Sequence, residues 1–494
     1  MDCLLGLDLG TTNIKVLAVT PDTWEIIAQS SIPLPTLSPQ PGYMEQDPEV
    51  VWKGVEEALT EVSIHVRRKK HTINRVCVSG AMHSLLAVDK HGKPLMNALL
   101  WSDNRAEEKA AELHAQSASL GRGIYEHTGT PIHPMIPLCK LAWFKEQQPE
   151  LLQQTAKFIS LKEYVWWKMT GQYQVDYSIA TATGLFDVKS RSWYQPALDF
   201  AGVKASQLSD LKETTYTVPY EPGEEIKIGL PAGVKLTIGA SDGCLANLGA
   251  GCIGPGITTI TIGTSGAVRR TVNEPLRDPH GRLFCYYLDE RADGDSGAKK
   301  PYYVFGGPTN NGANVLQWVA EKLTQQETED VVKQAERIAL GADGLLFLPY
   351  LHGERAPLWD ASARGAYLNV DYQHTRAHFI RAALEGVMFN LLSIEEMVTK
   401  QTGPAKEIYA NGGFAKSDSW VQMMADIFGV PVRLNESNES TAMGAILLAS
   451  DTESPLERLA DEVLFGETFK PDAERHKAYQ QVYKRWKEAV NLVE

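Results

Sequence analysis

The chain has 494 residues, of which 43% are hydrophobic and 22% charged, and its formal net charge is −13 at pH 7. This length exceeds what one compact core usually holds and predicts two large domains. The acidic balance disfavours nucleic acid as a partner, and no apolar run reaches the roughly 18 residues that a membrane helix needs. We therefore expect a globular enzyme that works on small molecules without membrane contact.

The six cysteines are scattered and show no C-x-x-C spacing. This favours small core residues in a reducing compartment over disulfides or a zinc site. The first residues include an acid and no basic segment, so they do not resemble a secretory signal, and we expect a cytoplasmic protein. Any anionic substrate needs cations supplied locally, because the net field of the chain repels it.

Two hairpins with similar patterns lie half a chain apart. Leu4 to Val19 alternates apolar residues on both sides of Gly-Thr-Thr, and Ile257 to Val268 does the same around Gly-Thr-Ser. Backbone N–H groups and hydroxyls at such turns suit phosphate oxygens. Either turn alone is common in ordinary hairpins. Together they predict a duplicated structure in which each domain presents one hairpin to a shared cleft.

The first half of the chain otherwise alternates between helix and strand. The patterns predict a helix over Asp47–Val66 that Asp47 caps, a strand over Arg75–Ser79, and an aromatic helix over Leu161–Thr170 that Gly171 ends. His83 follows the strand directly. From its position it could bind a substrate hydroxyl or simply satisfy a backbone carbonyl.

Asp242 stands where an apolar strand, Val234 to Ile238, gives way to a helix. A carboxylate at this place can accept a hydroxyl proton, and with a phosphate-binding turn about twenty residues later it indicates phosphoryl transfer to a hydroxyl. The structural alternative for Asp242 is a helix N-cap. We place the domain junction near Gly243, so that the N-terminal domain spans residues 1–243 and the C-terminal domain spans 244–494.

A glycine-rich run and a histidine pair match known binding patterns but lack the context that binding requires. Gly249 to Gly254 reads G-x-G-x-x-G, but it follows a predicted helix and precedes a strand, the reverse of what dinucleotide binding requires. His374 and His378 have i, i+4 spacing without a third ligand nearby, so we expect no metal there.

The second half of the chain contains several more predicted elements. They are a surface excursion over Leu288–Pro301, a helix from Gly312 to Leu323, strands over Leu345–Leu348, Ile408–Asn411 and Val430–Leu434, helices over Ala377–Thr399 and Ser440–Ala449, a helix ending at Phe428, and a helical tail to Glu494. Gly412 and Gly413 follow one strand, and paired glycines let a flat ring such as adenine lie against bare backbone. A helix-entry turn without a ligand is the alternative.

Several segments resemble the FGGY family of carbohydrate kinases. Met135–Gln147 fits the first family signature, and Gly365–Glu385 fits the second except that Asn369 stands where glycine is usual. The departure bears on local turn geometry. The resemblance runs from Leu4 to about Ser450. The S-G-x-M-H run at Ser79–His83 is similar to xylulose and gluconate kinases.

Other runs are most similar to gluconate kinases. They are I-G-A-S-D-G from Ile238, N-L-G from Asn247 and G-G-P-x-N-N-G from Gly306. Xylulose kinases usually have asparagine where this chain has Gly243.

The resemblance implies two duplicated actin-like (ribonuclease H-like) α/β domains, with ATP between them and the sugar deep in the cleft. It implies that Asp8 holds Mg²⁺, mostly through water. The implied nucleotide contacts are Thr11, Thr12, Asn13 and Lys15 at the first turn, Gly263 and Thr264 at the second, and Gln317, Gly412, Gly413 and Ser417 around the adenosine. The implied sugar contacts are Met82, His83 and Asp242. Homodimers are frequent in the family.

The expected reaction is the ATP-dependent phosphorylation of D-gluconate to 6-phospho-D-gluconate. A planar cation suits the gluconate carboxylate, and Arg105 and Arg355 are the candidates, with Glu354 placed to orient Arg355. Each arginine could equally form an ordinary ion pair. Xylulose or another sugar is the alternative substrate, and an actin-like ATPase without sugar chemistry is the alternative from a different class.

Overall fold

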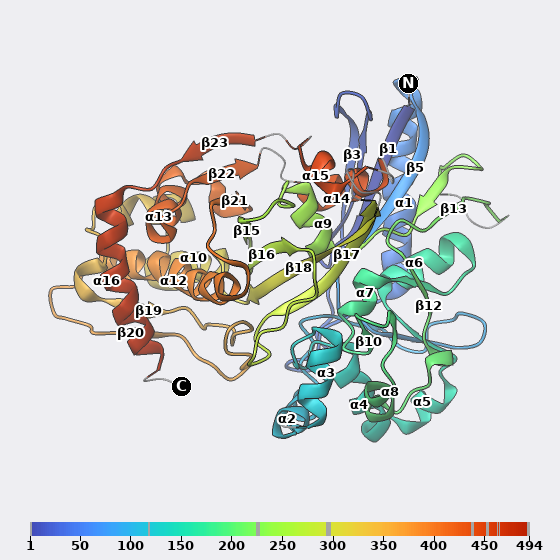
Figure 1. Ribbon diagram of the computed structural model, residues 1–494, viewed down its shortest axis with the longest axis horizontal. Helices are drawn as coiled ribbons and strands as arrows, with labels where there is room; N and C mark the ends of the chain where they lie inside the picture. Colours follow the sequence, from blue (N-terminus) through green and yellow to red (C-terminus); the bar gives the residue numbers. More distant parts are fainter. Residues whose placement is uncertain are drawn as a thin grey trace.

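The computed structural model describes residues 2–116, 119–223, 228–292, 298–435, 439–450, 454–461, 463 and 465–491. Two mixed β-sheets flanked by helices organise this part of the chain (Figure 1). The first sheet has six strands in the order β13-β14-β5-β1-β2-β3. The second has seven, in the order β17-β18-β16-β15-β21-β22-β23. The fold is α/β, as the sequence predicts.

The strands of the first sheet are β1 (Asp2–Leu9), β2 (Asn13–Val19), β3 (Ile26–Pro33), β5 (Thr72–Gly80), β13 (Thr217–Pro219) and β14 (Lys235–Thr237). Those of the second are β15 (Ile257–Ile262), β16 (Gly266–Val272), β17 (Phe284–Ala292), β18 (Lys299–Thr309), β21 (Glu407–Asn411), β22 (Val432–Asn435) and β23 (Phe465–Phe469). Short pairs are β4 (Glu45–Gln46) with β7 (Ala98–Leu99), β6 (Leu86–Val88) with β8 (Lys157–Ile159), β9 (Gln174–Asp176) with β12 (Asp210–Lys212), β10 (Phe186–Asp187) with β11 (Ser192–Trp193), and β19 (Leu346–Leu348) with β20 (Ala366–Leu368).

The helices up to the middle of the chain are α1 (Pro48–Arg68), α2 (Glu107–Ala115), α3 (Leu120–Thr128), α4 (Pro137–Gln147), α5 (Pro149–Gln154), α6 (Leu161–Thr170), α7 (Tyr177–Thr181), α8 (Gln195–Ala201) and α9 (Asp242–Gly249). Those after it are α10 (Ala313–Trp318), α11 (Thr328–Ala335), α12 (Arg376–Thr402), α13 (Asp418–Phe428), α14 (Ser440–Ser450), α15 (Leu456–Ala460) and α16 (Ala473–Val490). A π-helical turn, Val319–Thr324, continues α10.

One five-strand arrangement occurs in both sheets. In the first sheet β1, β2 and β3 are antiparallel neighbours, and β5 and β14 follow on the other side of β1 in parallel. In the second sheet β15, β16 and β18 are antiparallel neighbours, and β21 and β22 follow in parallel beyond β15. This repeat confirms the duplicated, actin-like architecture that the two Gly-Thr hairpins predict.

Capping residues mark the ends of several helices. Asp47 caps α1 by accepting the Glu49 N–H, and Pro48 occupies the first helical position, as predicted. Gly171 ends α6 in the left-handed conformation. Among the described helices α12 alone is long and apolar enough to cross a membrane. Because 83% of its apolar window is buried, α12 behaves as a core helix of the second domain.

Helices α9 and α14 join the two domains. A Cβ on Gly249 would lie 1.9 Å from the Ser440 carbonyl oxygen, and one on Gly444 would lie 1.9 Å from that of Leu245, so glycine is required for this close approach. Helix α14 also packs on β1 of the first sheet, where Ile446 joins a small apolar cluster (Figure 1). The G-x-G-x-x-G run therefore begins at a helix-packing glycine. The run begins at the last residue of α9 and precedes β15, which is the expected helix-then-strand order.

Some local expectations differ from the structure. Within the predicted excursion Leu288–Pro301, residues 288–292 and 299–301 belong to β17 and β18, and 293–297 lie outside the described residues. The tail contains the edge strand β23 between helices α15 and α16. Asn369 adopts φ = +59°, the left-handed conformation for which glycine is favoured. Asparagine tolerates that conformation, which explains the departure from the family signature.

The cysteines lie in the core, as the sequence predicts, and His374 and His378 contact nearby polar groups. All six cysteines are buried and unbridged. His378 contacts Asp343, and His374 accepts the Asp371 N–H, so both histidines have local partners. In the part of the chain that the structure describes, no cluster of three or more histidine, cysteine, aspartate or glutamate side chains could hold a metal.

Candidate active site

Two carboxylates lie at the same edge of the first sheet. Asp8 is near the end of β1 and pairs in register with Ser79 of β5. Asp242 follows β14, and its neighbour Ser241 bridges to Gly80 at the end of β5. Since β1, β5 and β14 run parallel, their carboxyl ends meet at one edge, which is where α/β proteins place their ligands.

The surroundings of the Asp8 carboxylate suit a cation ligand. Burial and the charge of Asp242 raise the pKa of Asp8 to about 7, while Ser79 and Lys15 oppose that rise. Its Oδ1 is buried and has no hydrogen-bond partner among the described residues. A buried carboxylate oxygen without a partner is costly, and a hard divalent cation is the ligand that removes this cost. The residues present therefore fit Mg²⁺.

Asp242 is the first residue of α9. Its Oδ1 accepts the N–H of Gly243 at 2.7 Å, and the N-cap position belongs to Ser241, so the N-cap alternative for Asp242 is wrong. Burial raises the pKa of Asp242 above its ordinary value, opposed by the Gly243 N–H and by the charges of Arg269, Lys162 and Arg355. The side chain is part-exposed, so a substrate hydroxyl can reach it.

The two Gly-Thr turns are held by the backbone and leave their threonines toward solvent. In the first, the Gly10 N–H donates to the Asn13 carbonyl, while Thr11, Thr12 and Asn13 are part or fully exposed. In the second, the N–H of Ala313 donates to the Gly263 carbonyl, and Thr264 is exposed. These are preformed turns with available hydroxyls.

Lys15 forms an ion pair across the two domains. Its Nζ lies 2.8 Å from both carboxylate oxygens of Glu439, which precedes α14. Both side chains are about one-third exposed, at 33% and 29%. The side chain expected near the γ-phosphate is thus engaged by a carboxylate from the other half of the chain.

A pocket of about 640 Å³ lies in the second domain beside the Gly412–Gly413 turn. Its walls include Gly413, Ser417, Phe414, Leu316 and Trp420. A Cβ on Gly413 would meet no atom within 4 Å, so bare backbone faces open space there. Gly412, by contrast, has φ = +105° and lies against the Ile262 carbonyl of β15. Gln317 is exposed and donates to Glu321 instead of lining this pocket.

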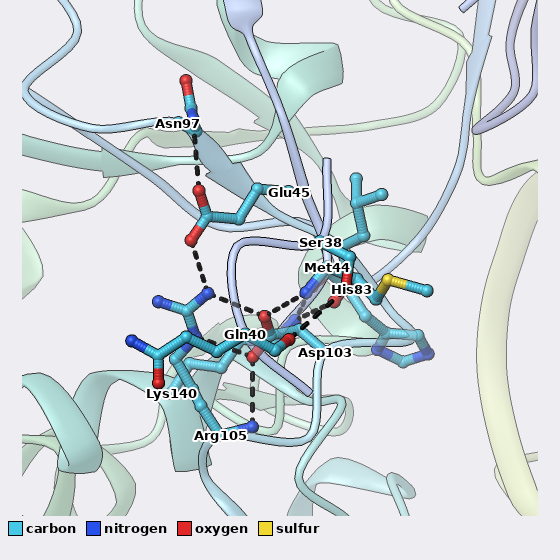
Figure 2. Close-up of polar contacts among 10 residues, drawn as sticks. Ser38, Gln40, Met44, Glu45, His83, Asn97, Asp103, Arg105 and Lys140 are labelled. Atoms are coloured by element: carbon cyan, nitrogen blue, oxygen red, sulfur yellow. Dashed lines mark hydrogen bonds and ion pairs between the residues drawn. The ribbon is translucent and has the colours of Figure 1, made fainter. Parts of the chain in front are cut away.

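His83, which follows β5, is held in a strained backbone conformation. Its φ is +67°, which is uncommon for a residue with a side chain and typical of functional sites. The buried Lys140 of α4 donates to the carbonyls of His83 and Leu100 at 2.7 and 2.6 Å (Figure 2). Nδ1 of His83 lies 2.8 Å from the Ala182 carbonyl and must carry the proton, because a carbonyl only accepts. Burial and Lys140 lower the pKa of His83 to about 3, so Nε2 presents an acceptor.

Arg105 is occupied by other groups of the first domain. Its guanidinium forms ion pairs with Asp103 and Glu45 at 2.8 and 2.6 Å (Figure 2) and stacks over Tyr43 at 4.0 Å. Its side chain is 5% exposed. The geometry therefore favours the structural role for Arg105 over a contact with substrate.

Arg355 and Glu354 have different roles. Glu354 is fully buried and accepts hydrogen bonds from Thr309, Asn310, Asn311, Asn390 and the Arg355 backbone N–H. It holds the loop in place and does not pair with the guanidinium of Arg355. That guanidinium donates to the Thr309 carbonyl and lies 5.0 Å over the ring of Trp101. Burial lowers the pKa of Arg355 to about 10, although the charge of Glu354 opposes this effect.

Further residues join this group that the sequence analysis did not select. The charge of Arg269 of β16 opposes the rise in the pKa of Asp242. The charge of Arg355 helps to lower the pKa of His133, and Tyr286 opposes the lowering of the pKa of Arg355. The signal for Arg269 was present, since strand alternation from the turn puts Ala267 and Arg269 on one face. For His133 and Tyr286 no local signal exists, because their role depends on contacts between distant segments.

Comparisons with known proteins agree with this geometry. The model for the N-terminal domain of the FGGY family of carbohydrate kinases matches residues 3–249, and that for the C-terminal domain matches residues 258–451. A gluconokinase of Bacillus subtilis (strain 168) is 39% identical over 458 residues, which cover 90% of this chain and 86% of that protein. A xylulose kinase of the same organism is 31% identical over 493 residues, covering 99% and 96%.

Solved structures give the same result. A gluconate kinase from Lactobacillus acidophilus has a TM-score of 0.92 at 30% identity and covers 99% of this chain and 98% of its own. With both domain models matched over most of the sequence, the chain belongs to the FGGY family of carbohydrate kinases.

Proposed function

We propose that this carbohydrate kinase transfers the γ-phosphoryl group of ATP to D-gluconate and forms 6-phospho-D-gluconate. The pair of carboxylates at one sheet edge, Asp8 and Asp242, is the observation that carries the chemistry. The similarity to gluconokinases at 39% identity supports the substrate. Residues 1–243 supply most sugar contacts in this proposal, and residues 244–494 supply the adenosine pocket.

Asp242 acts as the general base. It accepts the proton of the C6 hydroxyl as that oxygen forms its bond to the γ-phosphorus, and the bond from phosphorus to the bridging oxygen of ADP breaks. Phosphoryl transfer has a loose transition state, so positioning and charge stabilisation matter more than covalent chemistry. The raised pKa of Asp242 suits a base, because a more basic carboxylate accepts a proton more readily.

Asp8 would hold Mg²⁺, which, when bound, neutralises charge on the phosphate oxygens. Around it the hydroxyls and N–H groups of Thr11, Thr12 and Thr264 orient the phosphates. Ser417 and Gly413 border the adenosine in the 640 Å³ pocket. His83 accepts a hydrogen bond from a sugar hydroxyl through Nε2, and Met82 packs against the carbon chain.

For the carboxylate of gluconate we propose Arg355 in preference to Arg105. Arg355 is part-exposed beside Asp242, whereas Arg105 already has two carboxylate partners. A guanidinium with free donors matches a carboxylate in geometry as well as charge.

Xylulose is the second candidate substrate. A xylulose kinase is 31% identical to this chain, and a ligand-bound xylulose kinase structure from Lactobacillus acidophilus has a TM-score of 0.92 at 30% identity. Since both candidates use the same phosphoryl chemistry, only the sugar pocket distinguishes them.

An assay of ADP release with gluconate, xylulose, ribulose, glycerol and no sugar tests the proposal. We expect gluconate to give the highest kcat/KM, and ³¹P NMR should show a phosphomonoester at C6. A preference for xylulose would replace the substrate and keep the chemistry. Release of ADP at the same rate without sugar would instead indicate an actin-like ATPase.

A further inference from the structure

Arg269 is a cation in the site that has no carboxylate partner within the described part of the chain. Among the described residues its one side-chain hydrogen bond is from Nη1 to the Thr261 hydroxyl at 3.2 Å. Asp242 is the carboxylate whose charge acts most on it, yet no ion pair forms between them. Burial lowers the pKa of Arg269, which shows that its charge is partly desolvated.

Arg269 is part-exposed, and the arginines that are fully buried in the described chain are neutralised. Arg270, the next residue, points to the opposite face of β16 and pairs with Glu395. Arg291 pairs with Asp289, and Arg381 pairs with Glu385. A cation that is partly removed from water and has no counter-charge costs free energy, which a bound anion can offset. Arg269 and Arg355 thus have no carboxylate partner among the residues that the structure describes, and the charge of Arg269 helps to lower the pKa of Arg355.

The guanidinium of Arg269 lies within van der Waals distance of the space beside Gly243. A Cβ there would lie 3.6 Å from Nε and 3.7 Å from Nη2 of Arg269, and 3.0 Å from Cε of Met82. The guanidinium therefore lies alongside Gly243 and close to Met82, which follows β5 on the sugar side. A larger side chain at position 243 would compete with Arg269 for this space.

We propose that Arg269 is a specificity-determining residue that binds the carboxylate of a sugar-acid substrate together with Arg355. Two guanidinium groups offer a carboxylate more donors than it has lone pairs, so neither oxygen is left without a partner. A neutral sugar gives no reason to hold two unpaired arginines here. This inference rests on the proposed function, because it takes gluconate as the substrate.

The alternative anion is the transferred phosphoryl group. The two Gly-Thr turns and Asp8 already provide for the phosphates, whereas Arg269 lies on the Gly243–Met82 side of Asp242. The two roles differ in what they predict. A carboxylate contact affects gluconate binding in the absence of nucleotide, and a phosphoryl contact affects turnover and nucleotide binding without changing gluconate affinity.

The test measures the Kd of gluconate by titration calorimetry, without nucleotide, for the wild type and Arg269→Met. A hydrogen-bonded charge pair is worth about 1.5–3 kcal/mol, so we expect a Kd roughly 10- to 100-fold weaker. The Kd of a non-hydrolysable ATP analogue with Mg²⁺ should stay within about twofold. Arg269→Lys should recover part of the affinity, because it restores charge but not the planar fork.

Two further variants guard against misfolding. Gly243→Asn keeps Arg269 but fills its space, and we expect the same selective loss of gluconate affinity. Arg122→Met removes a 63%-exposed arginine of α3 and should change neither Kd.

An unchanged gluconate Kd in Arg269→Met overturns the inference, as does loss confined to turnover or to the ATP analogue. If the wild type itself prefers a neutral sugar, both the proposed function and this inference fail; if it binds gluconate and Arg269→Met binds it equally, only the inference fails.

Discussion

At the scale of single residues, Asp8 and Asp242 differ in their surroundings although their charges act on each other. Asp8 has a buried oxygen without a partner, and Asp242 has a backbone N–H and three positive charges near it. Two carboxylates in such different environments commonly have different catalytic roles. A cation ligand and a base are the roles that these two environments suit.

Asp242→Asn should lower kcat by about 10²- to 10⁴-fold, because general base catalysis is typically worth that much. The KM for ATP should change little, since the amide keeps the shape of the side chain. Steady-state kinetics with gluconate measure both constants. Asp472→Asn is the matched control, because Asp472 caps α16 on the surface and its loss should leave kcat unchanged. Turnover near that of the wild type in Asp242→Asn would remove Asp242 as the base.

Asp8→Asn should stabilise the ligand-free protein while it abolishes turnover. A folded pKa of about 7, against about 3.9 for an unfolded aspartate, means that ionised Asp8 destabilises the fold. The cost grows as pH rises from about 4 to 7 and reaches up to about 4 kcal/mol above pH 7. Urea unfolding without Mg²⁺ should show a larger gain at pH 8 than at pH 5. A gain independent of pH, or none, would contradict the electrostatic account.

At the scale of elements, strands and helices with a clear local period were predicted closely. α6 has the expected bounds, β21 begins one residue earlier than expected, and α12 extends the expected helix by a few residues. The edge strand β23 was missed because a five-residue strand with exposed positions has no strong alternation of its own. Its pairing with β22 decides its conformation.

Gly444→Val should strongly destabilise the protein. The new side chain would meet the Leu245 carbonyl and force α14 away from α9, which are packed backbone to backbone. Forcing extra atoms into a packed contact typically costs about 1–3 kcal/mol, and this backbone clash should reach the upper end or exceed it. Thermal unfolding measures the loss. Gly123→Ala in α3 is the control: its Cβ would have only an ordinary contact at 3.7 Å, so stability should stay equal or rise slightly. Equal melting temperatures for Gly444→Val and the wild type would contradict the packing argument.

At the scale of the whole molecule, the Lys15–Glu439 ion pair connects the two halves of the chain near the first Gly-Thr turn. If Lys15 is to reach the γ-phosphate, Glu439 competes with the nucleotide for it. A part-exposed ion pair is worth about 0–1 kcal/mol.

Glu439→Gln should therefore lower the KM for MgATP, by up to about fivefold, at nearly constant gluconate KM. Initial rates at varied MgATP measure the effect. Glu457→Gln removes an ion pair of similar exposure between Lys300 and α15 and should leave both constants unchanged. A raised or unchanged KM for MgATP in Glu439→Gln would show that this pair does not compete with nucleotide.

The sequence alone determined the two Gly-Thr hairpins, the duplication, and the place of Asp8 and Asp242 at strand ends. These follow from short-range alternation and turn chemistry, which a few consecutive residues contain. The tertiary structure decided which charges are paired. Arg105 pairs with Asp103 and Glu45, Lys15 pairs with Glu439, and Arg269 has no carboxylate partner among the described residues although the charge of Asp242 acts on it. Asp103 is two positions from Arg105, but Glu45 is 60 positions from it and Glu439 is 424 positions from Lys15, and only the folded chain brings such distant charges within reach of one another.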